Sequence, residues 1–430
     1  MDITDEIRVP RRTFLLLASL LVIALTSSLF VCIFVDDSSG VSLENVVYVK
    51  NEDALKNAIN NAPTDKSIAI ALDNDITLSD TLIIPINKNI TLTSNKINDF
   101  YKLVGADGKS TITVEGSGVL RLDGVIVTHV NGAEGRGVYV MENGYFIMNN
   151  GEVSGNTNTY DMYVWPRDGG GVFNRGVFEL YSGKIFNNQA TSGGGIYNMD
   201  GTFKMFGGEI SNNTATGYYT DAGIRYYTGN GGGVYVGGVF ELCGGKISNN
   251  KADGDGGGVY MNMYFGSTQY GVFSMFGGTI SSNTAGKDGG GVYSVQGGRL
   301  IDGIISSNTA GQNGGGVYWS NYWGDDGYDK WNVVVSGNTA KANGNDVYPN
   351  LGSSGGDGES SNGNNGSGGN GGGSGSGGNG GSSNGSGGFS LRDVVVICVG
   401  VALVIVGVVV AVLFFSFKKD TSFALSGISP

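Results

Sequence analysis

The sequence predicts an all-β fold in which a parallel β-helix, or β-solenoid, is flanked by two transmembrane helices. Three observations predict this fold class: a motif ending in asparagine occurs seven times, a glycine triplet followed by an aliphatic and an aromatic residue occurs six times, and two uncharged apolar segments bracket the repeats. Glycine supplies 78 residues and proline only 6, a bias that tandem repetition explains better than collagen or a proline-rich linker does.

The chain begins with a predicted cytoplasmic N-terminus, residues 1–13, which is followed by an apolar segment, residues 14–35. This segment has no charged residue, and it lies between Arg12 and Asp36. Its 22 residues are enough to span a bilayer. We predict an uncleaved transmembrane helix or signal anchor, because a cleaved signal peptide would have a shorter apolar region that ends at a small-residue site. Whether the segment is cleaved stays open.

Residues 36–110 are predicted to contain an N-terminal cap helix and irregular coils. Apolar residues recur at helical spacing over residues 51–62, with acidic residues at the start. Such a helix can close the open end of a solenoid. Strand-like runs follow at Ile68–Leu72, Thr81–Ile84, Ile90–Thr93, Thr111–Val114 and Val119–Leu122.

Residues 111–350 are predicted to form the repeat β-helix, because one short motif recurs at intervals of 25 to 37 residues. In each copy an isoleucine or valine stands three residues before an asparagine, and apolar residues alternate with polar ones as in strands. Identical side chains of successive coils then stack about 4.8 Å apart. Asparagine tolerates the left-handed backbone region and can bond its amide to the next coil. The predicted structural ladder consists of Asn156, Asn188, Asn213, Asn250, Asn283, Asn308 and Asn338.

The glycine triplets mark positions where the chain turns with positive φ or where coils approach closely. Three strands of three to five residues, separated by glycine turns, are expected to make one coil. The tyrosines that end most triplet motifs recur at strict coil spacing, which predicts a stacked structural column. The six motifs are Gly169–Phe173, Gly193–Tyr197, Gly231–Tyr235, Gly256–Tyr260, Gly289–Tyr293 and Gly314–Tyr318.

Residues 351–390 are almost wholly Gly, Ser and Asn, and they predict a flexible stalk that cannot pack. Residues 391–417 contain the second uncharged run and are predicted to form a transmembrane helix. Lys418 and Lys419 open a cytoplasmic tail, residues 418–430. Because Lys and Arg favour the cytoplasmic side, we expect both termini in the cytoplasm and the main domain outside the cell membrane.

The alternation of Gly-Gly-Gly-Val-Tyr with Ile-Ser-x-Asn over about residues 110–350 resembles the GGA(I/L) and FxxN repeats of polymorphic outer-membrane proteins. It resembles the adhesin-like surface proteins of methanogenic archaea more closely. An aliphatic residue here replaces the Phe of FxxN, and the repeats are followed by one apolar span rather than an autotransporter barrel. The resemblance implies a right-handed parallel β-helix of the pectin lyase-like type and adhesion at the surface of a single-membrane cell, archaeal or Gram-positive.

The net charge of −12 and the pI near 4.6 argue against nucleic-acid binding, because phosphate contacts need clustered Lys and Arg. His129 is the only histidine, so a Ser-His-Asp triad has a single candidate base, and metal-ligand spacing of Cys or His is lacking. We therefore expect no catalytic residue, no metal and no cofactor. Ca²⁺ at the turn residues Asp253, Asp255 and Asp288 is the alternative, although the Gly-Gly-x-Gly-x-Asp nonapeptide is missing.

Four insertions interrupt the coils, at residues 158–168, 215–230, 261–270 and 319–331, and all four tryptophans fall within them. Loops on a rigid scaffold commonly carry binding, and aromatic rings suit sugar or protein faces. The alternative, that these rings pack on the solenoid and anchor the loops, stays open. The candidate ligand-binding residues are Trp165, Tyr218, Tyr219, Tyr226, Tyr227, Trp319, Tyr322, Trp323 and Trp331.

Sequons of the form Asn-x-Ser/Thr begin at Asn89, Asn212, Asn365 and Asn384, and these are candidate glycosylation sites on an exported domain. We expect a non-enzymatic, adhesin-like surface protein whose partners are the membrane and either glycans or the surface proteins of neighbouring cells. One alternative is an extracellular polysaccharide lyase or glycoside hydrolase of the β-helix class, which would need clustered carboxylates. Another is a passive spacer of the cell envelope.

Overall fold

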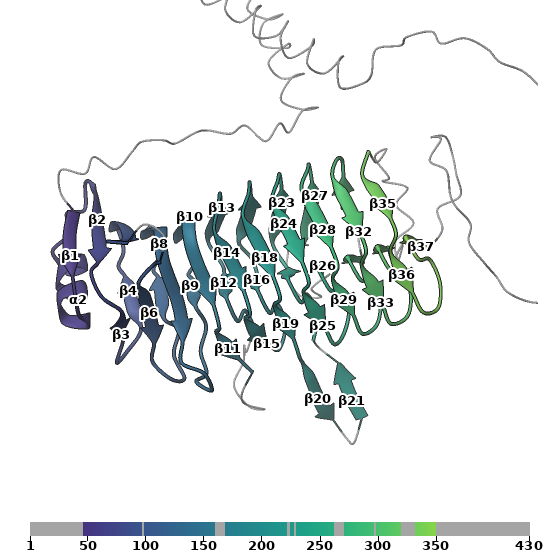
Figure 1. The fold of residues 1–430 in the computed structure, drawn as a ribbon, viewed down its shortest axis with the longest axis horizontal. Coiled ribbons are helices and arrows are strands. Elements are labelled where there is room, and N and C mark those ends of the chain that lie inside the picture. Colours follow the sequence, from purple (N-terminus) through teal and green to yellow (C-terminus); the bar gives the residue numbers. More distant parts are fainter. Residues whose placement is uncertain are drawn as a thin grey trace, which may run out of the picture. The chain divides into compact units, whose positions relative to one another are not determined.

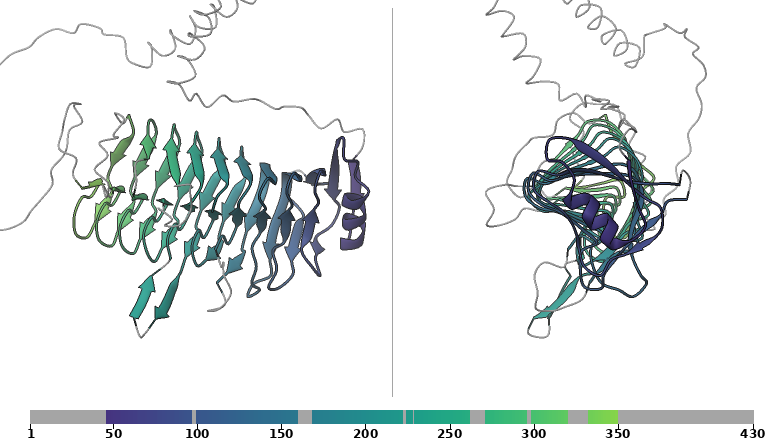
Figure 2. Two further views of the ribbon diagram at one scale, coloured as in Figure 1. Left: turned by 180° about the vertical axis from the view of Figure 1, so that it is seen from behind. Right: turned by 90° about the vertical axis from the view of Figure 1, so that its left-hand side faces the viewer.

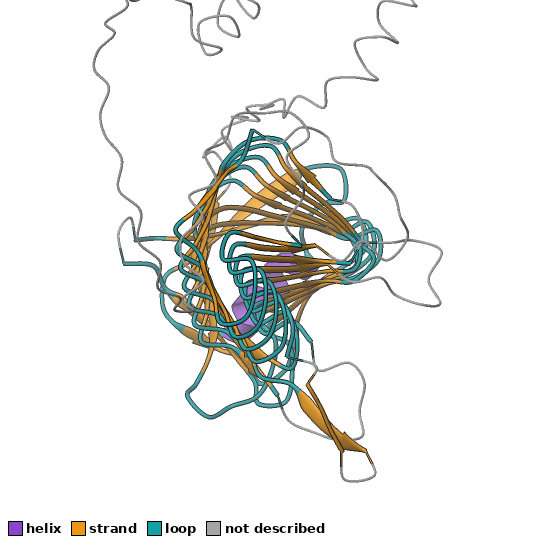
Figure 3. Cartoon of the chain, turned by 90° about the vertical axis from the view of Figure 1, so that its right-hand side faces the viewer, coloured by secondary structure: helices purple, strands orange, loops and turns teal. Residues whose placement is uncertain are grey.

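The computed structural model describes residues 46–96, 99–159, 168–221, 224–227, 229–261, 271–295, 298–319 and 332–349. These residues form a parallel β-solenoid in which successive coils stack along one axis (Figure 1). Viewed along that axis, the coils superimpose on a common cross-section with sheets along its sides (Figure 3). The predicted repeat architecture of stacked parallel strands is therefore confirmed.

Three parallel sheets, here called A, B and C, run along the solenoid. Sheet A has 18 strands: β1 (Val46–Val49), β2 (Ser67–Leu72), β3 (Ile76–Thr77), β5 (Asn89–Ser94), β6 (Lys102–Gly105), β8 (Val119–His129), β10 (Tyr145–Ser154), β13 (Val177–Leu180), β14 (Lys184–Phe186), β17 (Thr202–Met205), β18 (Glu209–Ser211), β23 (Val239–Leu242), β24 (Lys246–Ser248), β27 (Val272–Met275), β28 (Thr279–Ser281), β31 (Arg299–Leu300), β32 (Ile304–Ser306) and β35 (Val334–Ser336).

The other two sheets are built from shorter strands. Sheet B has ten: β4 (Leu82–Ile84), β7 (Ile112–Val114), β9 (Val138–Val140), β12 (Val172–Asn174), β16 (Ile196–Asn198), β22 (Val234–Val236), β26 (Val259–Met261), β30 (Val292–Ser294), β34 (Val317–Trp319) and β37 (Val347–Tyr348). Sheet C has seven: β11 (Thr157–Asn158), β15 (Gln189–Ala190), β19 (Thr214–Ala215), β25 (Lys251–Ala252), β29 (Thr284–Ala285), β33 (Thr309–Ala310) and β36 (Thr339–Ala340). A separate hairpin consists of β20 (Tyr218–Asp221) and β21 (Ile224–Tyr227).

The coils that begin at β12, β16, β22, β26 and β30 each contribute one strand to sheet B, two to sheet A and one to sheet C. The sequence predicted three strands per coil. The structure has four short ones, because a glycine turn divides the sheet A segment, as at Gly245 between β23 and β24, where φ is 84°. A Cβ there would lie 2.8 Å from the Gly207 carbonyl oxygen of the preceding coil, so no other residue fits without displacement.

The core is a stack of inward side chains that repeats once per coil. Phe146, Phe178, Phe203, Phe240 and Phe273 form one column, each at most 1 % exposed, with adjacent ring centroids 4.6 to 5.1 Å apart. Valines and isoleucines of sheet B and alanines of sheet C complete the interior. Buried and partly exposed residues alternate along β13 and β23, which is the predicted period of two.

The N-terminal end is closed by α2 (Glu52–Asn60), which lies across the end of the coils (Figure 2). Leu55 and Ile59 are 0 % and 1 % exposed and pack into the core. Asn51 caps the helix, because its Oδ1 accepts the Ala54 N–H at 2.9 Å. The predicted cap helix is confirmed.

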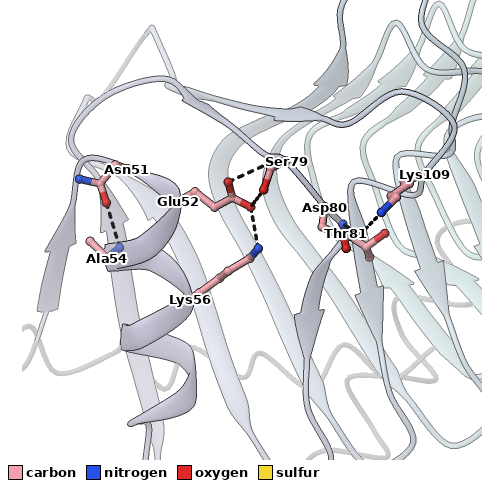
Figure 4. A network of polar contacts seen from close by, with 8 residues as sticks. All are labelled: Asn51, Glu52, Ala54, Lys56, Ser79, Asp80, Thr81 and Lys109. Carbon is pink, nitrogen blue, oxygen red and sulfur yellow. Dashed lines mark hydrogen bonds and ion pairs between the residues drawn. The ribbon is translucent and has the colours of Figure 1, made fainter.

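Polar contacts tie this helix to the next coil (Figure 4). Glu52 Oε1 lies 2.6 Å from Lys56 Nζ and accepts the Ser79 hydroxyl at 2.9 Å, while Oε2 accepts the Ser79 N–H at 3.0 Å. The hydrogen bond from Lys56 holds the pKa of Glu52 below its usual range. An acidic group in the first turn also suits the positive end of the helix dipole. Lys109 pairs with Asp80 at 2.7 Å in the same network.

The strand-like runs predicted between residues 68 and 122 are all strands: they correspond to β2, β4, β5, β7 and the first part of β8. The last of them is longer than expected, because β8 continues to His129. Sequence analysis did not predict β1, β3, β6 or the hairpin of β20 and β21.

No helix among the described residues is long and apolar enough to cross a membrane. The two predicted spans, residues 14–35 and 391–417, lie outside the described part of the chain, as do the predicted stalk and both termini. The membrane anchors therefore stay a prediction from the sequence.

Candidate functional site

The hairpin of β20 and β21 projects from the side of the solenoid (Figures 1 and 2). The two strands pair antiparallel, with Tyr218 opposite Tyr227 and Tyr219 opposite Tyr226. The structure thus brings together four of the predicted ligand-binding residues, which the sequence placed only in an insertion.

Backbone contacts fix the base of the hairpin to the coils. The Gly229 N–H donates to the Gly217 carbonyl at 3.0 Å, and the Gly254 N–H of the next coil donates to the Gly229 carbonyl at 2.8 Å. A Cβ on Gly229 would lie 2.6 Å from the Gly217 nitrogen, so the two chains can close only with glycine there. Isolated two-stranded hairpins are marginal in water, so this closure at the base stabilises the hairpin.

Trp319 is a core residue, which corrects the expectation that it binds a ligand from a loop. It ends β34, is 4 % exposed and packs in the main apolar cluster. In the register of sheet B it pairs with Ser294, which pairs with Met261, and both are buried. Counting in steps of two from the buried Val317 would have assigned Trp319 to the interior. The other predicted aromatic residues, Trp165, Tyr322, Trp323 and Trp331, lie outside the described residues.

The seven predicted ladder asparagines occupy the turn between sheets A and C, and each is at most 5 % exposed. Asn250 shows the pattern. Its Nδ2 donates to Asn283 Oδ1 and to the Ile210 carbonyl, both at 3.0 Å. Its Oδ1 accepts the backbone N–H of Asn213 at 3.0 Å and the Nδ2 of Asn213 at 2.9 Å. Each amide therefore satisfies buried groups of the turn, which is a structural role.

An aromatic column runs along the other face of sheet B. Adjacent ring centroids are 4.3 to 5.5 Å apart, and most of the rings are stacked. From Phe173 onward, the next ring covers most of each ring face, so this part of the column presents edges rather than faces, and sugar rings stack on faces. Its members are Tyr139, Phe173, Tyr197, Tyr235, Tyr260, Tyr293, Tyr318 and Tyr348.

A buried acid and an arginine, which sequence analysis did not identify, lie near the N-terminal end of this column. Arg136 lies over the Phe173 ring, with its Cζ 4.8 Å from the centroid, and its Nε donates to the Asp168 carbonyl at 2.9 Å. Burial raises the pKa of the Asp168 carboxyl to about 7, against the lowering effects of the Arg136 charge and of a hydrogen bond from the Ser192 backbone. The segment Gly135–Tyr139 is a variant of the glycine-triplet motif in which Arg136 replaces the middle glycine. This substitution could have identified Arg136 from the sequence.

Two of the aspartates considered for Ca²⁺, Asp255 and Asp288, accept hydrogen bonds from the equivalent turn of the next coil. Asp255 Oδ1 accepts the Asp288 N–H at 3.0 Å. Asp288 Oδ1 accepts the N–H and the Nδ2 of Asn313 at 2.8 and 3.0 Å. Over the described ranges, no group of three or more His, Cys, Asp or Glu residues is placed to hold a metal ion.

Two of the predicted glycosylation sites lie within the described residues. Asn212 is exposed, in a left-handed turn with φ of 55°. Asn89 is half-buried, and its Oδ1 accepts Arg121 Nη1 at 2.5 Å. Asn212 is therefore the more accessible of the two. Asn365 and Asn384 lie outside the described residues.

No protein-family model matches the chain, and no curated protein or solved structure matches it. What the chain does is therefore inferred from the geometry of its hairpin, its asparagine ladder and its aromatic column.

Proposed function

We propose that this chain is a membrane-anchored, adhesin-like protein of the cell surface that binds glycans or the surface proteins of neighbouring cells. The apolar segments 14–35 and 391–417 anchor it, and the Gly/Ser/Asn-rich stalk holds the solenoid away from the membrane. The positions of Lys and Arg favour an outward solenoid. Its coils wind right-handed, as crossovers between parallel strands do in nearly all proteins.

The projecting hairpin carries this proposal. The asparagine ladder and the aromatic column are committed to contacts within the solenoid. The hairpin adds no strand to sheets A, B or C, yet it keeps two tyrosine pairs in register. Tyrosine combines a flat apolar ring with a polar hydroxyl at low entropic cost, which suits contacts to sugars and to protein surfaces.

A glycan array probed with the full-length chain in detergent, together with an adhesion assay on intact cells, tests this proposal. One variant combines Tyr219→Val with Tyr226→Val, and a second combines Tyr218→Val with Tyr227→Val. Valine keeps the strand propensity of the hairpin while it removes the ring. We expect at least one variant to lose about tenfold or more in apparent affinity. Tyr145→Val, at a tyrosine of sheet A that is 44 % exposed, is the control and should bind normally.

The outcomes separate the candidate functions. Normal binding by both double variants would place the ligand elsewhere and reject the hairpin as the site. A wild-type chain that binds neither glycans nor cells would be a passive spacer. New reducing or unsaturated ends in a polysaccharide incubated with the chain would indicate a lyase or hydrolase instead.

The exported location is tested separately by modification at Asn212, which we propose carries an N-linked glycan. Thr214→Val removes the sequon but leaves Asn212 in its left-handed turn. We expect the Thr214→Val chain, isolated from its own host, to be lighter than the wild-type chain by the mass of the glycan. Thr309→Val is the control. Thr309 occupies the position in sheet C that is equivalent to Thr214, three coils further along, and it lies in no sequon. An unmodified Asn212 in the wild-type chain would reject this assignment.

A further inference from the structure

Asn89, the first residue of β5, begins the sequon Asn89-Ile90-Thr91. Its Oδ1 accepts a hydrogen bond from Arg121 Nη1 at 2.5 Å. Because a guanidinium group only donates, this contact fixes which atom of the amide is the oxygen. Nδ2, the atom to which an N-linked glycan is attached, has no hydrogen-bond partner among the residues that the structure describes. The fold therefore leaves the glycan-accepting atom of this amide free.

The hydroxyl of Thr91 completes this sequon but forms no hydrogen bond in the folded chain. Thr91 is 4 % exposed, and its Oγ1 is buried without a partner. A buried polar group without a partner costs roughly 1–3 kcal/mol, so a valine of the same shape would suit this strand better. The sequon, however, requires a hydroxyl at its third position. Thr91 is thus unfavourable for packing and necessary for glycosylation.

A surface pocket of about 470 Å³ includes Asn89 in its wall. Its volume lies in the range of small-ligand sites, about 300–1,000 Å³. Asn87 and Ser117 enter the pocket from left-handed turns of two successive coils, with φ of 62° and 58°, and Ser117 Oγ donates to Asn87 Oδ1 at 2.9 Å. Val119 adds an apolar wall. The complete lining is Thr64, Asn87, Lys88, Asn89, Ser117 and Val119.

The lining groups keep both donors and acceptors for a ligand. Lys88 Nζ donates to the Asn60 carbonyl oxygen at 3.2 Å and to the Ala62 carbonyl oxygen, which leaves one of its three N–H groups. The hydroxyl of the exposed Thr64 has no partner in the described part of the chain, and the Ser117 hydroxyl can still accept. None of the six lining residues is acidic. A sugar ring, whose hydroxyls both donate and accept, matches this set of groups.

We propose that Asn89 carries an N-linked glycan whose first sugar occupies this pocket, a proposal that rests on the exported location proposed above. In the transfer, Asn89 Nδ2 bonds to C1 of the first sugar of a lipid-phosphate-linked oligosaccharide. The C1–O bond to the phosphate breaks, the phosphate leaves with the electron pair, and one Nδ2 proton passes to a base of the transferase. The product amide keeps its oxygen, which still accepts from Arg121. Because Thr91 is buried between Ala69 and Arg121 in the register of sheet A, the transfer precedes the pairing of β5 with β8.

Mass spectrometry of glycopeptides from the full-length chain, isolated from its own host, tests the modification. We expect a glycan on Asn89 in the wild-type chain and none in the Thr91→Val chain. Thr93→Val is the matched control, because Thr93 is the next residue on the same face of β5 and belongs to no sequon. A glycan on Asn212 with an unmodified Asn89 would overturn this proposal and leave the exported location standing. If neither asparagine were modified, both proposals would fail.

Thermal unfolding of the same chains tests whether the sugar occupies the pocket. In chain produced by cells without N-glycosylation, Thr91→Val removes only an unpaired hydroxyl and should raise the thermal midpoint by roughly 1–3 °C. In chain from its own host, the substitution also removes a sugar that contacts only the folded state, and should lower the midpoint by about 2 °C or more. Thr93→Val should shift the midpoint by the same amount in both preparations.

A variant of the pocket itself gives a second test that leaves the sequon intact. Ser117→Ala removes one hydroxyl from the lining and its hydrogen bond to Asn87. It should lower the midpoint more in glycosylated chain than in chain without glycans, because only the former also loses a contact to the sugar. Equal midpoint shifts in the two preparations, for Thr91→Val or for Ser117→Ala, would mean that the glycan extends into solvent and would overturn its place in the pocket.

Discussion

The asparagine ladder and the aromatic column repeat with the same period but are held together by different forces. Every ladder asparagine is at most 5 % exposed and binds its neighbours through directional hydrogen bonds. The aromatic column lies on the outer side of sheet B, and its rings attract one another by stacking, which has no donor and no acceptor end. Within this one chain the column accepts Phe173 among its tyrosines, whereas all seven ladder positions are asparagine. A buried polar repeat therefore demands one residue type, and a stacked apolar repeat demands only a ring.

The strongest test of this contrast is Asn250→Ala. The substitution removes the acceptor of the Asn213 N–H and the side-chain donor to the Ile210 carbonyl. The Asn213 Nδ2 keeps the Ile185 carbonyl and the Asn283 Oδ1 keeps the backbone N–H of residue 250, but each loses one hydrogen bond. Each unsatisfied buried group costs roughly 1–3 kcal/mol, so we expect a loss of about 3 kcal/mol or more, measured by thermal and denaturant unfolding. Asn249→Gly, at the adjacent left-handed position with φ of 56°, should stay within about 0.5 kcal/mol of the wild type. Similar losses for both would show that the ladder bonds are not what the turn depends on.

A smaller loss is expected in the aromatic column. Tyr235 is 8 % exposed and lies 4.3 Å from the Tyr197 ring and 5.1 Å from the Tyr260 ring. Tyr235→Ala should cost about 2–3 kcal/mol through lost packing, and Tyr235→Phe about 0.5 kcal/mol or less, because the ring remains. Unfolding curves of the two variants, measured side by side, separate the contribution of the ring from that of the hydroxyl. If Phe were as harmful as Ala, the hydroxyl rather than the stacked ring would hold the column.

The buried acid beside this column should make part of the stability depend on pH. Burial raises the pKa of Asp168 from 3.8 to about 7, so between these values the folded chain binds a proton that the unfolded chain has released. Below pH 3.8 this group therefore does not change the free energy of unfolding. The free energy of unfolding falls as the pH rises from 3.8 toward 7, and it stays reduced above pH 7. Asp168→Asn should raise stability by on the order of 2 kcal/mol at pH 8 and change it little at pH 4. A thermal-midpoint gain of the same size at both pH values would contradict the buried-acid explanation.

The smallest effect is expected on the outer face of sheet A, where Glu179, Lys204 and Glu241 are neighbours in register. Lys204 lies 3.2 Å from Glu241, and both side chains are partly exposed. Lys204→Glu would place three like charges in a row and should cost about 1 kcal/mol at low salt, less at high salt. Lys204→Gln should cost no more than about 0.5 kcal/mol. Equal thermal midpoints for Glu and Gln at low salt would mean that charge alternation does not contribute here.

Much of this architecture is readable from the sequence because a solenoid repeats a local rule. The isoleucine-to-asparagine spacing identified every member of the ladder, and the triplet motif identified most of the aromatic column. The helical spacing at residues 51–62 identified the cap. These features depend on residues close together in the chain, whose periodicity survives without knowledge of the fold.

The remaining features depend on which residues meet across coils 25 or more positions apart. The buried ring of Trp319 and the raised pKa of Asp168 both arise from such contacts. The sequence by itself determined the period, the inward and outward positions and the residue types of the ladder. Only the tertiary structure decided the direction of the ladder and the residues at its two ends, His129 and Asp346, because a hydrogen bond acquires a direction only when its donor and acceptor are in place.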